Sequence, residues 1–218
     1  MNSAFNCKTV KYEIKSLPKL KKPKLKKPEL KKPKSKEILA FDFDGVFHNK
    51  MHPDENIETD HRSPDQDFLF NNFIKNSNSL KPFLIDSTLE KIKNALTQGN
   101  KVYIISANSG RLKEPIYTLL TNLGIKIPKK NIIMKERQKS LKLGEIEATE
   151  FTDDSMVNIK NIHRAKKNLP HLQKLIWVWP EKKRFYEIDL QKKLSIFKKD
   201  WAKKIRTGQH IEGVKIIT

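Results

Sequence analysis

The chain has 218 residues, a length that suits one domain of ordinary size and an additional segment. Its only cysteine, Cys7, excludes a disulfide framework and a cysteine-based zinc site, and no apolar run approaches the roughly 20 residues of a membrane span. Lys and Arg number 45 against 25 Asp and Glu, which gives a net charge of +20. The first residues lack the apolar stretch of a signal peptide, so we expect a soluble intracellular protein, in the cytoplasm or nucleus, with no membrane partner.

The positive charge lies in two regions of the sequence. Residues 1–37 contain 13 Lys and 3 Glu, a net charge of +10, and residues 160–206 contain 15 Lys and Arg against 4 acids, a net charge of +11. Residues 38–159 sum to about −1. This distribution predicts chemistry in the middle and attraction of a polyanion, such as nucleic acid, at the ends. An alternative is that the abundance of Lys, Asn and Ile reflects AT-rich coding.

Residues 1–36 form a Lys-rich segment in which prolines recur every five residues from Pro18 to Pro33. Proline at this density excludes a helix and favours an extended, polyproline-like chain without a core. We therefore predict a disordered tail, followed by one domain over residues 37–218. Three roles are open for the tail: a solvated linker, an anchor on a nucleic-acid backbone, and a localisation signal.

Two buried strands and a helix begin the domain. Residues 38–41 are apolar at every position, which is typical of a strand covered on both faces in a parallel sheet. Residues 86–98 show helical spacing of apolar side chains and end at Gly99, and residues 102–105 form a second buried strand.

Strands and helices continue to alternate along the domain. The further expected elements are a helix over residues 112–123, strands over residues 132–134, 149–152 and 172–178, and a basic helix over about residues 188–206. This alternation predicts an α/β fold with a doubly wound parallel sheet, whose functional site lies at the carboxyl ends of the strands. The lysines of the last helix are explained either as a solvated face or as a nucleic-acid surface.

A polar insert over residues 47–85 follows the first strand. It is too short for a large cap domain, but a cap-like segment emerging there should border the site and influence substrate choice. We interpret its histidines, His48, His52 and His61, as surface residues, with a second metal site as the alternative.

Two tryptophans alternate in a late strand. Trp177 and Trp179 should point to one face, and core packing is the expected role. The alternative is a stacking platform for nucleic-acid bases, because Lys182, Lys183 and Arg184 follow closely.

Two carboxylates follow the first strand directly. Asp42 and Asp44 are two positions apart, so both side chains can turn to the same side. Their repulsion would raise one pKa unless a cation offsets it, and Mg²⁺ is a cation that prefers oxygen ligands.

Polar side chains follow two later strands as well. The turn at residues 106–109 opens a helix, and its backbone amides and hydroxyl could bind a phosphate. Asp153 and Asp154 follow the strand near Phe151. Four acids therefore lie at the carboxyl ends of two strands, where one metal ion could bind them.

Four segments of the chain resemble the four ordered motifs of the haloacid dehalogenase (HAD) superfamily. They are, in order, DFDGV, IISANS, a lysine and FTDDS, and the likeness spans about residues 38–180. In phosphatases of this superfamily the first aspartate attacks phosphorus and forms an aspartyl-phosphate, so the resemblance implies that Asp42 is the nucleophile. It implies that Asp44 is the general acid and base, which protonates the leaving oxygen and later activates water.

The resemblance implies a phosphate site made by Ser106, Ala107, Asn108 and Lys139. The serine would bind the transferring phosphoryl group, and the lysine would balance its charge. We choose Lys139 as this lysine because it precedes a possible helix, and Lys135 and Lys142 are the alternatives.

The resemblance also implies a Mg²⁺ site. Asp154 would be the main acidic ligand, beside the Asp42 carboxylate and the backbone carbonyl of Asp44, with Asp153 adjacent. Many relatives have a further Asp four residues after the main ligand, whereas this chain has Asn158, which can still orient a ligand or a water.

The function that these residues predict is Mg²⁺-dependent hydrolysis of phosphomonoesters. Phosphorylated nucleic-acid ends are the favoured substrate because basic segments flank the catalytic region, and the DFDGV and DDS motifs also resemble phosphatase domains of nucleic-acid repair proteins, including the Swiss-army-knife RNA-repair group. The alternatives are a nucleotidase or sugar-phosphate phosphatase, and a non-catalytic nucleic-acid-binding protein on the same fold.

Overall fold

The computed structural model describes residues 36–48, 83–192, 204, 207 and 209–217. All of them belong to one compact unit, Ser35–Thr218. The expected tail, all but the two ends of the insert, and His52 and His61 lie outside these ranges. Among the helices that the ranges contain, none is both long enough and apolar enough to cross a membrane.

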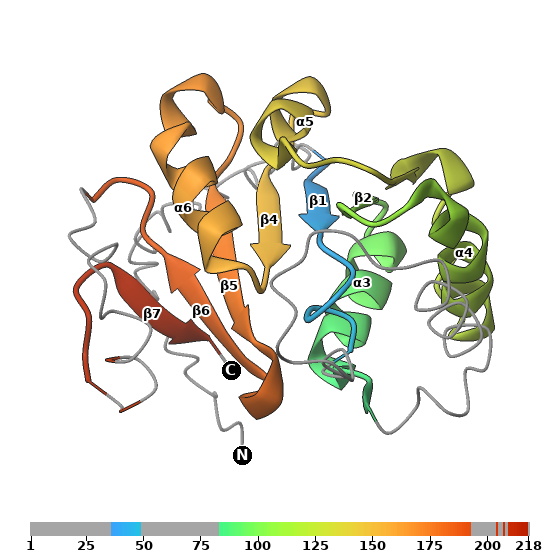
Figure 1. Ribbon diagram of the computed structural model, residues 1–218, viewed down its shortest axis with the longest axis horizontal. Coiled ribbons are helices and arrows are strands. Elements are labelled where there is room, and N and C mark those ends of the chain that lie inside the picture. The colour runs from blue at the N-terminus through green and yellow to red at the C-terminus, as the bar shows by residue number, and fades with distance from the viewer. Residues whose placement is uncertain (1–35, 49–82, 193–203, 205–206, 208, 218) are drawn as a thin grey trace, which may run out of the picture. The chain divides into compact units, whose positions relative to one another are not determined.

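A seven-stranded sheet with the order β3-β2-β1-β4-β5-β6-β7 forms the centre of the fold (Figure 1). The strands are β1 (Ile38–Phe41), β2 (Lys101–Ile105), β3 (Ile132–Ile133), β4 (Glu150–Asp153), β5 (Lys174–Trp179), β6 (Arg184–Ile188) and β7 (Val214–Ile217). The first five pair in parallel, and β6 and β7 continue the sheet in antiparallel pairing.

Four helices connect the parallel strands. They are α3 (Asp86–Thr97), α4 (Lys113–Asn122), α5 (Lys139–Glu145) and α6 (Met156–Arg164). Buried side chains of α3 and α4 belong to one hydrophobic core, and those of α5 and α6 to a second. The helices therefore cover both faces of the sheet, which is the doubly wound arrangement expected from the sequence.

The composition of β1 follows from its place between the two cores. Phe41 packs in the core of α3 and α4, whereas its neighbour Ala40 packs in the other core, because successive side chains of a strand point to opposite faces. Both side chains are fully buried, and a buried Phe stabilises the fold by about 1.5–3 kcal/mol. A strand buried on both faces must be apolar throughout, as residues 38–41 are.

The strand order reverses between β1 and β4, which lie side by side in Figure 1. Phe41 is in register with Ile104 of β2 and Thr152 of β4, so Asp42 and Asp153 lie at the same level, at the carboxyl ends of neighbouring strands. A doubly wound sheet binds its ligands at such a switch point. The expected α/β fold class with a doubly wound sheet is confirmed by this topology.

The end of the chain differs from the sequence prediction. A basic helix was expected over about residues 188–206, but β6 extends to Ile188 and no helix begins before Lys192. The pairing of β6 with β5, in which Leu175 is opposite Ile188, places the first residue of the expected helix in a strand. Most of the remaining range, residues 193–206, lies outside the described residues.

The tryptophans of β5 have the expected core role. Trp177 is 4% exposed, and its ring lies 5.0 Å from the ring of Tyr186. Trp179 is partly buried against the same core. The alternative of a base-stacking platform at Trp177 is wrong, because its ring has no free face to offer.

Candidate active site

Three carboxylates meet at the switch point. Asp42 follows β1, Asp153 ends β4, and Asp154 is the next residue. One oxygen of each lies within 4.8 Å of the others. Asp42 is 8% exposed and Asp153 is completely buried, so their charges cannot be screened well by water.

Lys139, the first residue of α5, lies between two of these carboxylates. Its Nζ is 2.9 Å from Oδ2 of Asp42 and 2.8 Å from Oδ2 of Asp153. Burial lowers the pKa of Lys139, but the two carboxylates more than offset this effect, and the pKa lies above its ordinary value. Lys139 therefore remains a cation at the centre of the site.

Among the described residues, neither of the two alternative lysines pairs with an aspartate of the site. Lys142 pairs with Glu145 at the end of α5, on the helix surface. The side chain of Lys135 lies over the backbone of Gly110. Of the three lysines considered from the sequence, Lys139 is the one that the structure places beside the carboxylates.

One ammonium group does not neutralise the acidic cluster. Burial raises the pKa of Asp42 to about 7; Lys139 lowers it, while Asp153 and Asp44 raise it further. Burial and the neighbouring carboxylates also raise the pKa of Asp154 well above its ordinary value. An excess of buried carboxylate oxygens fits a hard divalent cation such as Mg²⁺, which would balance the remaining negative charge.

The adjacent acids Asp153 and Asp154 have different surroundings. Asp153 Oδ1 accepts a hydrogen bond from the backbone N–H of Ser155 at 2.7 Å, and the Asn158 amide donates to Oδ1 and Oδ2 at 3.2 and 3.0 Å. With the Lys139 bond, Asp153 is surrounded by donors. An aspartate at position 158 would instead repel Asp153, which explains an asparagine there.

Asp154 approaches the turn that follows β1. A Cβ atom added to Gly45 would lie 2.1 Å from Oδ2 of Asp154, and Gly45 has a φ of +66°. Both the contact and the left-handed backbone require glycine. Among the described residues, no hydrogen-bond donor contacts the carboxylate of Asp154 as Ser155 and Asn158 contact that of Asp153. The oxygens of Asp154 therefore suit a cation.

Asp44 is held by two nitrogen atoms. The side-chain amide of Asn108 donates to Oδ2, and Nε2 of His48 lies 3.2 Å from Oδ1. His48 is 1% exposed and packs edge-on against the ring of Phe43. These contacts fix the direction of the Asp44 carboxyl group.

His48 thus differs from its sequence interpretation. It was considered a surface residue or a ligand in a second metal site, whereas it is buried against Asp44. The contact of the Asn108 side-chain amide with Asp44 was not predicted, and a phosphate at the backbone of this turn stays a prediction. The contact between Asp44 and His48 could have been predicted from their separation of four residues at the start of the insert.

The polar turn after β2 lies beside the aspartates of β1. Ser106 is 1% exposed, and its Oγ accepts the backbone N–H of Asn108 at 3.1 Å. Its carbonyl accepts the N–H of Glu136 at 3.0 Å, which fixes the turn to the loop after β3. Ala107 is exposed. A turn with its hydroxyl and backbone amides fixed in this way can bind an anion.

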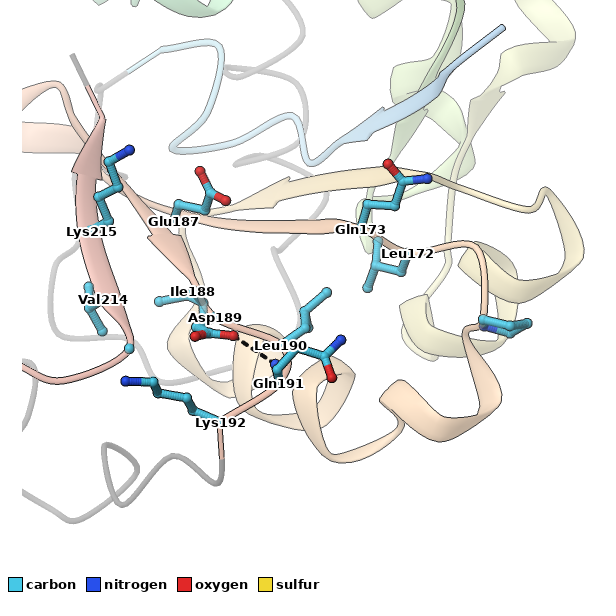
Figure 2. Close-up of a pocket in the computed structure, with 12 residues that line it drawn as sticks. Leu172, Gln173, Glu187, Ile188, Asp189, Leu190, Gln191, Lys192, Val214 and Lys215 are labelled. Carbon is cyan, nitrogen blue, oxygen red and sulfur yellow. Dashed lines mark hydrogen bonds between the residues drawn. The ribbon is translucent and has the colours of Figure 1, made fainter. Parts of the chain in front are cut away.

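A separate groove of about 610 Å³ lies at the other end of the sheet (Figure 2). Gln173, before β5, and Ile188, at the end of antiparallel β6, both line it, so the groove is remote from the carboxyl ends of the parallel strands. Asp189 on its wall accepts the backbone N–H of Gln191 at 2.8 Å. The four aspartates of the switch point take no part in it.

No family model matches the chain, and no curated protein matches it. Among solved structures, the HAD domain of the effector protein Lem4 from Legionella pneumophila is similar, with a TM-score of 0.42 and 18% sequence identity, over 79% of this chain and 93% of that chain. In this chain, Asp42, Lys139 and Asp154 lie together at the switch point.

Proposed function

We propose that the protein is a Mg²⁺-dependent phosphohydrolase that acts through an aspartyl-phosphate on Asp42. One observation supports this function above the others: a buried lysine bridges Asp42 and Asp153 at the switch point, while Asp154 adds a third carboxylate. A purely binding protein would have no use for so costly a group of buried charges.

In the first half of the reaction, an oxygen of Asp42 attacks phosphorus, and the bond from phosphorus to the ester oxygen breaks. Asp44 donates its proton to that leaving oxygen, which departs as an alcohol. His48 and Asn108 keep Asp44 in position for this transfer. The phosphoryl group then remains on Asp42.

In the second half, Asp44 takes a proton from a water molecule as the water attacks the phosphorus of the aspartyl-phosphate. The bond between phosphorus and Asp42 breaks, and inorganic phosphate and the free carboxylate result. The amides of the turn at residues 106–108 and the Lys139 ammonium offset the charge that develops on the phosphoryl oxygens.

Asp42, Asp154 and the backbone carbonyl of Asp44 would bind the Mg²⁺. When bound, the ion supplies positive charge that stabilises the transferring phosphoryl group. It would also lower the pKa of Asp42 from about 7, so that the nucleophile is ionised under neutral conditions. Asp153 instead keeps Lys139 in place.

Phosphorylated nucleic-acid ends are the substrate that we favour. The net charge of +20 attracts polyanions, and the exposed Lys182 and Arg184 lie between the carboxyl end of β5 and the start of β6, the edge that contains the site. Small phosphate esters would need much less positive charge.

The substitution Asp42→Asn tests the function. An amide cannot accept the phosphoryl group, so phosphate release should fall on the order of 10³-fold or more, with the fold intact by circular dichroism. Asp189→Asn, in the remote groove, is the matched control and should retain full activity.

The assay should compare 3′- and 5′-phosphorylated DNA and RNA ends with nucleotides and sugar phosphates, with and without Mg²⁺. A folded Asp42→Asn protein that retains a near-normal rate would exclude the covalent mechanism. Turnover of nucleotides or sugar phosphates alone would exclude nucleic-acid ends as the substrate.

A further inference from the structure

Lys135 lies beside the site in an unusual backbone conformation. Its φ is +62°, a left-handed value that favours Gly or Asn over a lysine. The residue is exposed, in the loop between β3 and α5. Lysine offers this loop no conformational advantage. The presence of lysine at this position therefore points to a role for its side chain.

Two hydrogen bonds fix this loop to the polar turn after β2. The N–H of Lys135 donates to the carbonyl of Asn108 at 2.9 Å, and the N–H of Glu136 donates to the carbonyl of Ser106 at 3.0 Å. The Cε atom of Lys135 lies 3.4 Å from the position of a Cβ on Gly110. The backbone of Lys135 is thus fixed to the turn, and its side chain lies near Gly110.

Two cationic side chains at this position lack a carboxylate partner among the described residues. Among the described residues, neither Lys135 nor the exposed Arg111 forms an ion pair with a carboxylate. Lysines at the other end of the sheet do form such pairs, for example Lys129 with Glu114. A cation held without a partner beside a phosphate site can bind a second anionic group of the substrate.

We propose that Lys135 is a substrate-binding residue that contacts the phosphodiester adjoining the terminal phosphate of a nucleic-acid substrate. This proposal rests on the proposed function, since the terminal phosphate must occupy the turn at residues 106–108. A phosphodiester is the favoured partner because the chain has a net charge of +20, which suits a repeating polyanion better than a peptide. Lys135 then distinguishes a nucleic-acid end from a mononucleotide.

The test compares Lys135→Asn with the wild type on two substrates: a mononucleotide and a dinucleotide with the same terminal phosphate. Asparagine tolerates the left-handed backbone, so the melting temperature should not fall. The KM for the dinucleotide should rise about tenfold, the effect of one lost charge-assisted hydrogen bond, while the KM for the mononucleotide and both kcat values stay unchanged. Lys135→Arg should restore much of the affinity.

Two controls separate charge from backbone effects. Glu147→Asn replaces an exposed residue with a φ of +55° at the other end of α5, and it should change the KM for neither substrate. Lys130→Asn removes an exposed lysine from the start of β3 and should also have no effect. On longer single-stranded DNA, Lys135→Asn should reduce the salt slope of log affinity by about 0.7.

Two results would overturn the proposal. They are an unchanged KM for the dinucleotide and an equal rise in KM for both substrates. Wild-type activity on dinucleotides is required for both comparisons. If the wild type hydrolyses only sugar phosphates, the proposed substrate class is wrong as well; if it hydrolyses dinucleotides, only the role of Lys135 is in question.

Discussion

At the scale of single residues, the four aspartates of the site differ in the groups that surround them. Asp153 is bonded to Lys139, Ser155 and Asn158 and is completely buried. Asp154 lies against a glycine, and its pKa is raised mainly by burial. The first environment supplies hydrogen-bond donors to both carboxylate oxygens, whereas the second leaves a carboxylate that gains most from a metal ion.

We expect Asp154→Asn to weaken Mg²⁺ binding at least about tenfold, because a ligand is lost at the cation. Asp153→Asn should instead lower the free energy of unfolding, since Lys139 keeps only the Asp42 carboxylate as a partner. Calorimetric Mg²⁺ titration and urea unfolding of both variants provide the measurements. Equal losses of affinity would mean that both acids are ligands.

The Mg²⁺ affinity measured in this titration should also depend on pH. Below the Asp42 pKa of about 7 the carboxyl group holds a proton that Mg²⁺ must displace, so affinity rises as the pH increases from 6 to 8. The change is up to about tenfold per pH unit for each displaced proton. Heats measured at pH 6 in buffers of different ionisation enthalpy should therefore differ. Identical heats would show that no proton is released.

At the scale of elements, the site depends on a close contact between the turn after β1 and the loop after β4. Gly45→Ala would force a Cβ to within 2.1 Å of Asp154 and strain a backbone with a φ of +66°. We expect kcat/KM and Mg²⁺ affinity to fall at least about tenfold, and the free energy of unfolding to fall by about 1–3 kcal/mol.

Gly99→Ala is the matched control for this turn. Gly99 has a similar φ of +77°, but a Cβ there meets no atom within 4 Å. The Gly99→Ala variant should therefore lose about 1 kcal/mol of its free energy of unfolding from backbone strain alone, and it should retain full activity. If the two variants lose activity equally, backbone strain and not the Asp154 contact is responsible.

The elements that the sequence predicted best are those with a strong local pattern. Residues 38–41 are continuously apolar, and the helix expected over residues 86–98 is observed as Asp86–Thr97. The antiparallel strands β6 and β7 were not predicted, because β6 depends on pairing with β5 and β7 on pairing with β6, which local spacing cannot show. The helix α6 was not predicted, although Met156, Ile159 and Ile162 recur in it at helical spacing.

The same limit applies to the candidate site. Motif order was enough to select Asp42, Asp44, Ser106 and the acidic pair, since each follows a recognisable strand. The contact of Asn108 with Asp44 depends on how two loops meet across the sheet, whereas His48 contacts Asp44 within one loop, four residues away. A pairing between distant segments, such as that of Asn108 with Asp44, follows from the tertiary fold and leaves no periodic pattern in the sequence.

At the scale of the whole molecule, charge and chemistry are separated along the chain. Residues 38–159, which contain the four aspartates and Lys139, have a net charge of about −1, whereas residues 1–37 have a charge of +10. Charge outside the catalytic region can attract a long polyanion without changing the reacting groups. Binding of long substrates and chemistry at the terminal phosphate should therefore respond to different substitutions.

Deletion of residues 1–36 removes all 13 lysines of the basic segment and leaves every residue of the site in place. We expect hydrolysis of a small chromogenic phosphate ester to be nearly unchanged, and KM for long phosphorylated DNA to rise. If those lysines contact the backbone, log affinity falls with log salt with a slope of roughly −0.9 per phosphate contacted on duplex DNA. Steady-state kinetics at two salt concentrations should then show a much weaker salt effect in the truncated protein. The same salt dependence in both proteins would contradict an anchoring role and leave residues 1–36 as a linker or a localisation signal.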